Sequence, residues 1–131
     1  MVRIANLVCS EGTSAKPDGL TLENPVAKIT LDSLPNNYSF FVTFSIVDLC
    51  GVVTTDDYVH ISLKSSQDIE IFNSRVQLPT PEDLDVPLDN NLTGNFLLNN
   101  IKFSSTGLYT LEVSSNLCES ARTYFYVDKK C

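Results

Sequence analysis

The chain has 131 residues, of which 43% are apolar and 19% charged, and its formal net charge is −7. This length and composition suffice for a buried core, so we expect one domain over residues 1–131. The negative charge and the nine scattered basic residues argue against nucleic-acid binding. No apolar run approaches the ~18 residues of a membrane span, and residues 1–9 are too polar for a signal peptide. We therefore expect a cytoplasmic protein with reduced thiols and no membrane partner.

Short apolar segments alternate with turn signals along the whole chain, and none shows the apolar stripe of a helix. In chain order we predict strands at residues 2–9, 20–22, 26–31, 38–49, 58–64, 69–78, 93–103, 108–115 and 121–127. Residues 10–19 are predicted to form a polar loop, residues 34–37 a turn, and residues 79–92 the longest loop, with one helical turn possible at 80–82. The last two strands are expected to pair as a hairpin.

The alternation of side chains predicts which face of each strand points inward. The longest predicted strand, 38–49, is expected to be central, with Tyr38, Phe40, Val42, Phe44 and Ile46 on one face. In strand 58–64 the predicted inward residues are Val59, Ile61 and Leu63. In the first strand they are Ala5, Leu7 and Cys9, in strand 26–31 they are Ala27, Ile29 and Leu31, and in the last strand they are Thr123, Phe125 and Val127.

The most informative stretch is residues 98–113, where an apolar strand ends at Phe103 and alternation resumes at Tyr109 after a polar corner that contains Gly107. A tyrosine just after such a corner is typical of antiparallel β-sandwiches, in which its hydroxyl binds nearby backbone. We therefore predict an all-β fold, a two-sheet antiparallel β-sandwich with immunoglobulin-like architecture, in which most of the seven to nine strands pair antiparallel.

Two resemblances accompany this prediction. The segments Ile-Ala-Asn-Leu-Val-Cys-Ser at 4–10 and Asp-Gly-Leu-Thr-Leu at 18–22 resemble the start of a family of uncharacterised bacterial and phage-associated domains. Short matches follow at Ile29, 34–35, 40–44, 107–109 and 125–127, although Ser10 replaces the acid usual in that family. The resemblance implies a β-sandwich and no chemistry. The Gly107-x-Tyr109 corner is similar to immunoglobulin-like sandwiches, but the chain has no Trp, and Leu111 stands where an antibody domain has cysteine.

The four cysteines form no close pair, and a single histidine accompanies them, so no zinc site is expected. Cys50 and Cys118 both lie near predicted strand ends, where a disulfide is one possibility. Sequence position alone does not establish that two cysteines are close in space.

Acidic residues gather in two predicted loops, and the weak metal candidates among them are Asp56, Asp57, Asp83 and Asp85. Together such loops can supply the oxygen ligands that calcium needs, but the spacing of a calcium-binding loop is absent. Acids in polar loops are more often simply solvated. We expect no bound metal and no cofactor.

No catalytic residue is predicted. His60 falls on the outer side of its strand beside Ser62 and Lys64, and nothing in the sequence marks a nucleophile for it. Tyr124 and Tyr126 fall on the face opposite Phe125 and are candidates for a binding surface, because tyrosine offers amphipathic contact area at low entropic cost. The alternative is that a loop or the other sheet covers them.

These observations favour a non-enzymatic protein-binding or structural module of a bacterium or phage. Its partner is expected to be another protein or a second copy of the chain, met by loops or by an edge strand. The alternative is a secreted calcium- or carbohydrate-binding domain. A hydrolase is the least favoured, since no constellation of residues argues for it.

Overall fold

The computed structural model of the chain describes residues 2–16, 19–49, 54–78 and 91–130. These residues form nine strands: β1 (Arg3–Lys16), β2 (Gly19–Pro25), β3 (Lys28–Leu31), β4 (Asn36–Val47), β5 (Tyr58–Lys64), β6 (Glu70–Gln77), β7 (Asn91–Phe103), β8 (Gly107–Ser115) and β9 (Cys118–Lys129). Nothing in the described ranges is a helix long and apolar enough to cross a membrane. The predicted all-β class is confirmed.

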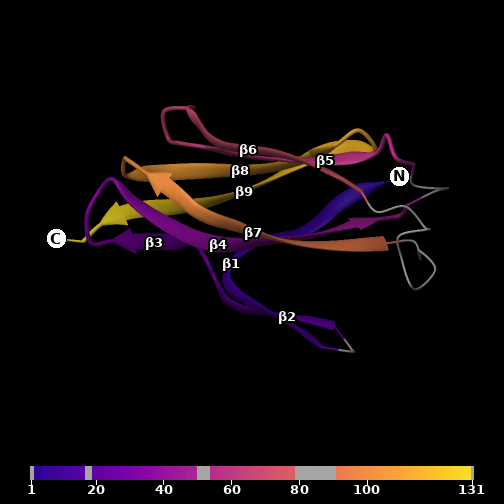
Figure 1. Ribbon diagram of the computed structural model, residues 1–131, viewed down its shortest axis with the longest axis horizontal. Helices are drawn as coiled ribbons and strands as arrows, with labels where there is room; N and C mark the ends of the chain where they lie inside the picture. Colours follow the sequence, from indigo (N-terminus) through magenta and orange to yellow (C-terminus); the bar gives the residue numbers. More distant parts are fainter. Residues whose placement is uncertain (1, 17–18, 50–53, 79–90, 131) are drawn as a thin grey trace.

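The strands form two sheets (Figure 1). The four-stranded sheet has the order β2-β1-β4-β7, and all of its pairs are antiparallel. The five-stranded sheet has the order β3-β9-β8-β5-β6. Its pairs are antiparallel except that β3 runs parallel to β9, which agrees with the prediction of mostly antiparallel strands. Parallel neighbours need a long connection, and here β3 and β9 are far apart in the sequence.

The core lies between the sheets, where aromatic rings from both meet. The ring of Phe125 on β9 lies 5.5 Å from Phe40 of β4 and 6.0 Å from Phe103 of β7. Phe103 in turn lies 5.1 Å from Tyr109 of β8. The alternation predicted for β4 and β5 is confirmed at the buried positions Phe40, Val42, Phe44, Ile46, Val59, Ile61 and Leu63. Tyr38, the first inward position predicted for β4, is only partly buried and packs against the edge of the core.

The corner between β7 and β8 has the predicted hydrogen bond. The buried Tyr109 directs its hydroxyl back along the chain and donates to the carbonyl oxygen of Ser105 at 2.8 Å. The hydroxyl of Ser105 lies 3.2 Å from the same tyrosine oxygen. The bond ties the corner to the core, because the tyrosine ring packs against Phe103.

We expect Tyr109→Phe to lower the free energy of unfolding by about 1–3 kcal/mol. The ring keeps its packing, but the partly buried Ser105 carbonyl loses its donor. Urea denaturation measures the change. Tyr126→Phe is the matched control, because its side chain is exposed, and we expect less than about 0.5 kcal/mol there. Equal losses in the two variants would show that the corner bond contributes nothing.

The inward face predicted for the first strand is wrong in its first half. Asn6 has a φ of 55°, and the register between β1 and β4 shifts between Ala5 and Val8. This bulge reverses the alternation, so Ile4, opposite the buried Ile46, takes the inward place expected for Ala5. A second inward prediction also fails, because Ala27 precedes β3 and is exposed.

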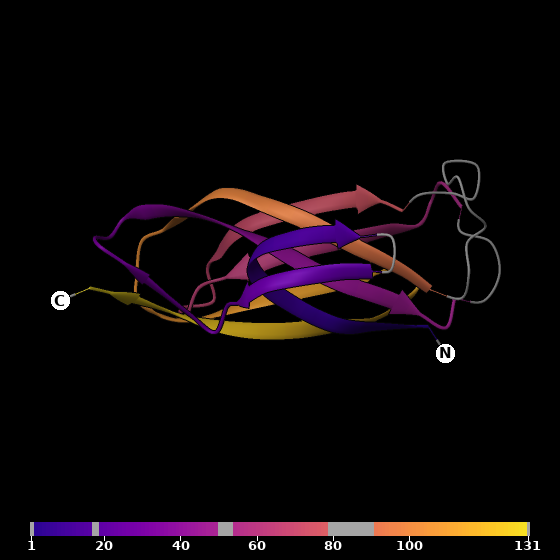
Figure 2. The ribbon, with the colours of Figure 1, turned by 90° about the horizontal axis from the view of Figure 1, so that it is seen from below.

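The predicted polar loop at 10–19 is also wrong. Residues 11–16 continue β1 and pair with β2 as an extended hairpin, here called the arm (residues 11–16 and 19–25). The arm extends away from the two sheets in Figure 1 and lies nearest the viewer in Figure 2, and Asn95 of β7 donates a hydrogen bond to Thr13 at 2.9 Å. With the arm included, β1 has 14 residues and is longer than β4. The prediction failed because residues 11–16 read Glu-Gly-Thr-Ser-Ala-Lys, a sequence without the alternating apolar side chains that mark a strand.

Candidate interaction face

Exposed apolar side chains gather on the outer face of the five-stranded sheet. Leu108 of β8 and Tyr124 and Tyr126 of β9 are 51%, 52% and 44% exposed. Leu108 lies directly opposite Tyr126 in the strand pairing, and Tyr124 is two residues from Tyr126 on the same face. We call these three residues the tyrosine patch. It lies on two neighbouring strands in the interior of the sheet, and of its three residues Tyr126 pairs on both sides, with Leu108 of β8 and with Lys28 of β3.

The structure confirms that Tyr124 and Tyr126 face away from the core, as the alternation around Phe125 predicts. Sequence reasoning missed Leu108 as their neighbour. The signal was present, because a residue next to the inward Tyr109 must face outward in a regular strand. What the sequence does not show is the register that places it opposite Tyr126.

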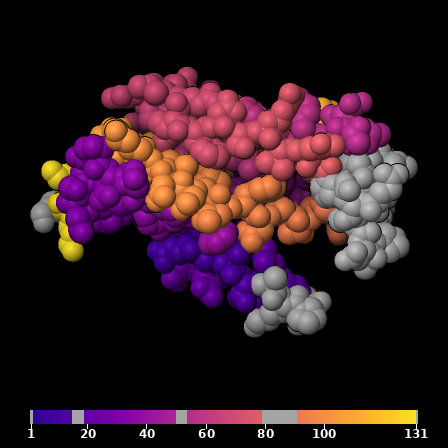
Figure 3. Space-filling view, in the orientation of Figure 1, coloured from indigo at the N-terminus to yellow at the C-terminus, as the bar shows by residue number. Residues whose placement is uncertain are grey.

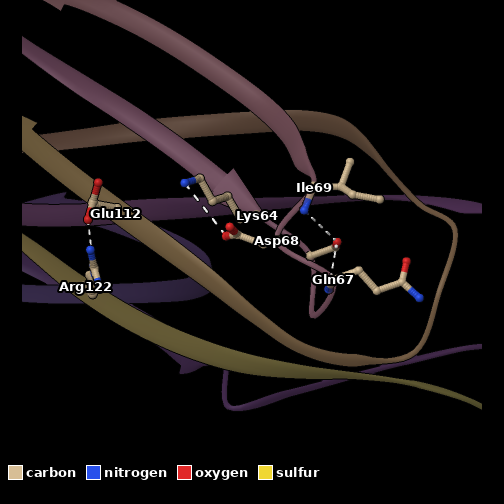
Figure 4. Close-up of polar contacts among 7 residues, drawn as sticks. Lys64, Gln67, Asp68, Ile69, Glu112 and Arg122 are labelled. Atoms are coloured by element: carbon tan, nitrogen blue, oxygen red, sulfur yellow. Dashed lines mark hydrogen bonds and ion pairs between the residues drawn. The ribbon is translucent and has the colours of Figure 1, made fainter.

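A charged depression adjoins the patch, with a volume of about 130 Å³. It is lined by Ser62, Lys64, Asp68, Thr110, Glu112 and Arg122. Figure 4 shows its two ion pairs: Arg122 Nε to Glu112 Oε2 at 2.6 Å, and Lys64 Nζ to Asp68 Oδ1 at 3.9 Å. The hydrogen bond to Glu112, and then its charge, raise the pKa of Arg122. Thr110 pairs with Tyr124, so the depression and the patch form one continuous surface.

The turn between β5 and β6 positions Asp68 for this depression. The hydroxyl of Ser65 accepts hydrogen bonds from the backbone N–H groups of Gln67 and Ile69, at 3.3 and 3.2 Å (Figure 4). Asp68 has a φ of 62°, a conformation that aspartate adopts more readily than most residues. The turn therefore sets the acid beside Lys64 and leaves Ile69 exposed.

His60 lies further along the same outer face and is half-buried. Its Nε2 is hydrogen-bonded to Asn73 of β6. The guanidinium of Arg75 lies 3.6 Å from the centre of the Tyr58 ring beside it. Both contacts join β5 to β6 across the outer face of the five-stranded sheet.

The weak metal candidates are not brought together among the described residues. Asp57 is buried and its carboxylate already serves the fold: it accepts hydrogen bonds from the Thr54 N–H at 2.8 Å and from Asn116 Nδ2 at 2.9 Å. Asp56 is exposed, and Asp83 and Asp85 lie outside the described residues. No group of three or more metal-ligating side chains is found in the described ranges. The Asp57–Asn116 bond instead joins the turn before β5 to the turn between β8 and β9.

We expect Asp57→Asn to remove part of the acid sensitivity of the fold. The hydrogen bond from Thr54, and then that from Asn116, lower the pKa of Asp57 below its usual range. Because the folded-state pKa is depressed, the stabilisation is complete above about pH 4 and is lost as the pH falls through the folded-state value. Urea denaturation at pH 7 and pH 3 should show a stability gap between wild type and variant that narrows at pH 3. Asp56→Asn, an exposed neighbour, should show no such gap.

The cysteines of the described residues are free thiols. Burial raises the pKa of Cys9 to about 12, and burial followed by the charge of Glu119 raises that of Cys118. The disulfide considered between Cys50 and Cys118 is not formed in the structure, since Cys118 is free. Cys50 itself lies outside the described residues.

We expect Cys9 to resist iodoacetamide at pH 8 in the folded protein, because the thiolate is the reactive form and this thiol stays protonated. Peptide mapping by mass spectrometry should find Cys9 labelled only after urea is added. Labelling of Cys9 without denaturant would mean that β1 opens under native conditions.

No known protein family and no curated protein matches the chain in sequence. Among solved structures, the chain is similar to part of the alkylpurine DNA glycosylase AlkC of Pseudomonas fluorescens, with a TM-score of 0.56 and 11% identity. That similarity covers 97% of this chain and 30% of the glycosylase. A β-glucosidase of Listeria innocua gives a TM-score of 0.45 at 12% identity, over 98% of this chain and 16% of the enzyme. At such identities the similarity concerns the fold alone.

Proposed function

We propose that the chain is a non-enzymatic binding module that presents the tyrosine patch to a protein partner. The observation that supports this most directly is the patch itself, three large apolar side chains left exposed side by side on interior strands. Exposed apolar surface grouped in this way costs solubility and is typical of interaction sites. Tyrosine suits the role because its ring buries area while its hydroxyl remains hydrated.

The charged depression gives the patch a polar border. An apolar centre with a charged rim is the usual layout of a protein interface, in which the rim charges orient the partner. The two ion pairs leave both signs of charge available at the surface. We therefore propose a partner surface with its own mixed charges around an apolar centre.

We propose further that the fold is an immunoglobulin-like β-sandwich and that the chain acts as one domain, in a bacterium or a phage. The tyrosine corner, and the aromatic rings of the two sheets that meet in the core, support the architecture. The similarity to AlkC supports a modular use, because nearly all of this chain corresponds to less than a third of that protein. The free thiols of Cys9 and Cys118 support a reducing compartment such as the cytoplasm.

The test is a comparison of matched variants. Wild type, Tyr124→Ala/Tyr126→Ala and Ile69→Ala are immobilised and exposed to lysate of the source cells. Ile69 is 57% exposed but lies in the turn between β5 and β6, outside the tyrosine patch and the residues that line the depression, so it controls for the loss of any exposed apolar side chain. The proposal predicts a protein retained by wild type and by Ile69→Ala and lost from the tyrosine variant. Equal retention by all three would refute it.

A carbohydrate ligand is the second candidate, because paired exposed tyrosines also stack on sugar rings. A glycan array probed with the same three proteins separates the two. Binding of a glycan that depends on Tyr124 and Tyr126 would replace the protein partner. A rise in melting temperature with calcium would instead favour a metal-binding domain, since a ligand bound by the native state stabilises it.

A further inference from the structure

The β7 strand lies at an edge of the four-stranded sheet, and β4 is the only strand of the described residues that pairs with it. Along such an edge, alternate N–H and C=O groups point outward without a strand partner. Proteins usually protect edges with charges, prolines or bulges. Residues 91–99 contain neither a charged residue nor a proline, and the bulge in this pair comes only after Leu98. The other edge strand on this side, β6, carries Glu70 and Arg75.

An apolar pocket of about 180 Å³ opens beside this edge, between β7 and β6. Figure 3 shows the two strands next to each other on the viewed face. The pocket is lined by Leu92 and Phe96 of β7, Val76 of β6 and Phe44 of β4, among others. Gly94 leaves room for the stacked rings of Phe44 and Phe96, since a Cβ there would lie 3.1 and 2.8 Å from them.

The pocket lies where the side chains of an added strand would go. A strand paired with β7 would run about 4.8 Å from it, and every second side chain would point to the inner side of the sheet. That inner side faces the five-stranded sheet, where the pocket is open. The remaining side chains would point to the outer side, which the arm reaches at Asn95 and which is open to solvent at Leu97. The edge therefore suits a segment in which apolar and polar residues alternate.

We propose that the β7 edge binds an extended segment of a partner protein by strand addition, with an apolar side chain in the pocket and basic residues on the outer side. The backbone hydrogen bonds of the edge supply affinity, and the pocket supplies the preference for a large apolar side chain. The net charge of −7 favours a basic segment. This site is on the other sheet from the tyrosine patch and does not depend on it.

The first experiment uses a synthetic peptide, acetyl-Lys-Val-Lys-Phe-Lys-Val-Lys-amide, added to the isotope-labelled full chain. The proposal predicts that NMR shift changes concentrate on the amides of residues 91–99 and that these amides exchange more slowly with solvent. The same peptide with its Phe and both Val residues N-methylated keeps the side chains but loses backbone donors. We expect at least tenfold weaker binding for it. Shift changes confined to the outer face of the five-stranded sheet, or no binding, would overturn the proposal.

The second experiment fills the pocket. Val76→Phe places a ring where the peptide side chain would go, and we expect at least tenfold weaker binding with circular dichroism unchanged. Ile69→Phe is the control, because Ile69 is 57% exposed beyond the other end of β6. Unchanged affinity of Val76→Phe for the peptide would refute the binding of a peptide side chain in the pocket. If Val76→Phe misfolds, the N-methylated peptide still decides the matter.

Two further measurements distinguish the β7 edge from the tyrosine patch and from pairing between two copies of the chain. Tyr124→Ala/Tyr126→Ala should bind the peptide as wild type does, so failure of either proposal leaves the other standing. Sedimentation of the protein without peptide tests whether a second copy of the chain binds at the β7 edge. A concentration-dependent dimer that Val76→Phe abolishes would show that the edge pairs with itself, and would overturn a foreign partner.

Discussion

Replacing Phe125 with alanine is expected to lower the free energy of unfolding by about 3–5 kcal/mol. The side chain is 1% exposed, and its ring contacts Phe40 and Phe103 across the sheets and Tyr109 on the neighbouring strand. Removing it leaves a cavity between two sheets whose hydrogen-bonded backbones cannot easily close on it. Since domains of this kind are stable by about 5–15 kcal/mol, the loss is a large part of the total. Urea denaturation measures it.

The control for this change is its neighbour. Tyr124→Ala removes an aromatic side chain from the same strand, but from the exposed face, and should alter stability by less than about 0.5 kcal/mol. Phe125→Leu should recover much of the loss, because it restores most of the buried volume. Similar losses in Phe125→Ala and Tyr124→Ala would mean that the sheets do not pack through Phe125.

Gly107→Ala is expected to be the second most damaging single change. Gly107 has a φ of 131°, a region that L side chains rarely adopt, and its Cβ would lie 2.6 Å from Ser66 Oγ and 2.7 Å from Ser66 Cβ. The backbone conformation and the steric contact each cost about 1–3 kcal/mol. The residue begins β8 immediately after the corner, so neither the turn nor the strand can shift freely. Thermal and urea denaturation measure the combined loss.

A double variant separates the two causes. Ser66→Gly removes both atoms that the new Cβ would meet, so Gly107→Ala/Ser66→Gly should recover the steric part and keep the backbone part. Ser66→Gly alone also removes the weak 3.4 Å hydrogen bond from Ser66 to the Thr106 carbonyl, and its own effect must be subtracted. No recovery in the double variant would assign the whole loss to φ.

The candidate site was predictable only in part. Alternation around the buried Phe125 predicts that Tyr124 and Tyr126 face outward, and the structure confirms it. The charged depression was not predicted, because Lys64 and Glu112 come from strands far apart in sequence. The pocket beside β7 was equally hidden. The pocket depends on which strands lie at the edges of the sheets, and the residues of a single strand do not reveal the order of strands in a sheet.

The acidic loops show the same limit, because there the sequence suggested a metal ligand and the structure gives the residue a different role. Sequence alone offered Asp57 as a weak calcium ligand because it lies in a polar turn. In the tertiary structure the Asp57 carboxylate accepts hydrogen bonds from Thr54 and from Asn116, which is 59 positions away in the sequence. A carboxylate that accepts two hydrogen bonds from the protein is held in place by the fold, and its lowered pKa follows from them.

The sequence by itself determined the fold class, most strand positions and the inward faces of β4, β5 and β9. These follow from a local cause, the period of two that a strand imposes on residues sorted between core and water. Only the tertiary structure decided the bulge at Asn6, the arm, the parallel pairing of β3 with β9 and the register that brings Leu108 to Tyr126. Those features depend on the free energies of contacts between segments that are distant in the sequence. Such contacts produce no periodic pattern of apolar and polar residues, so they cannot be read from the sequence of one segment.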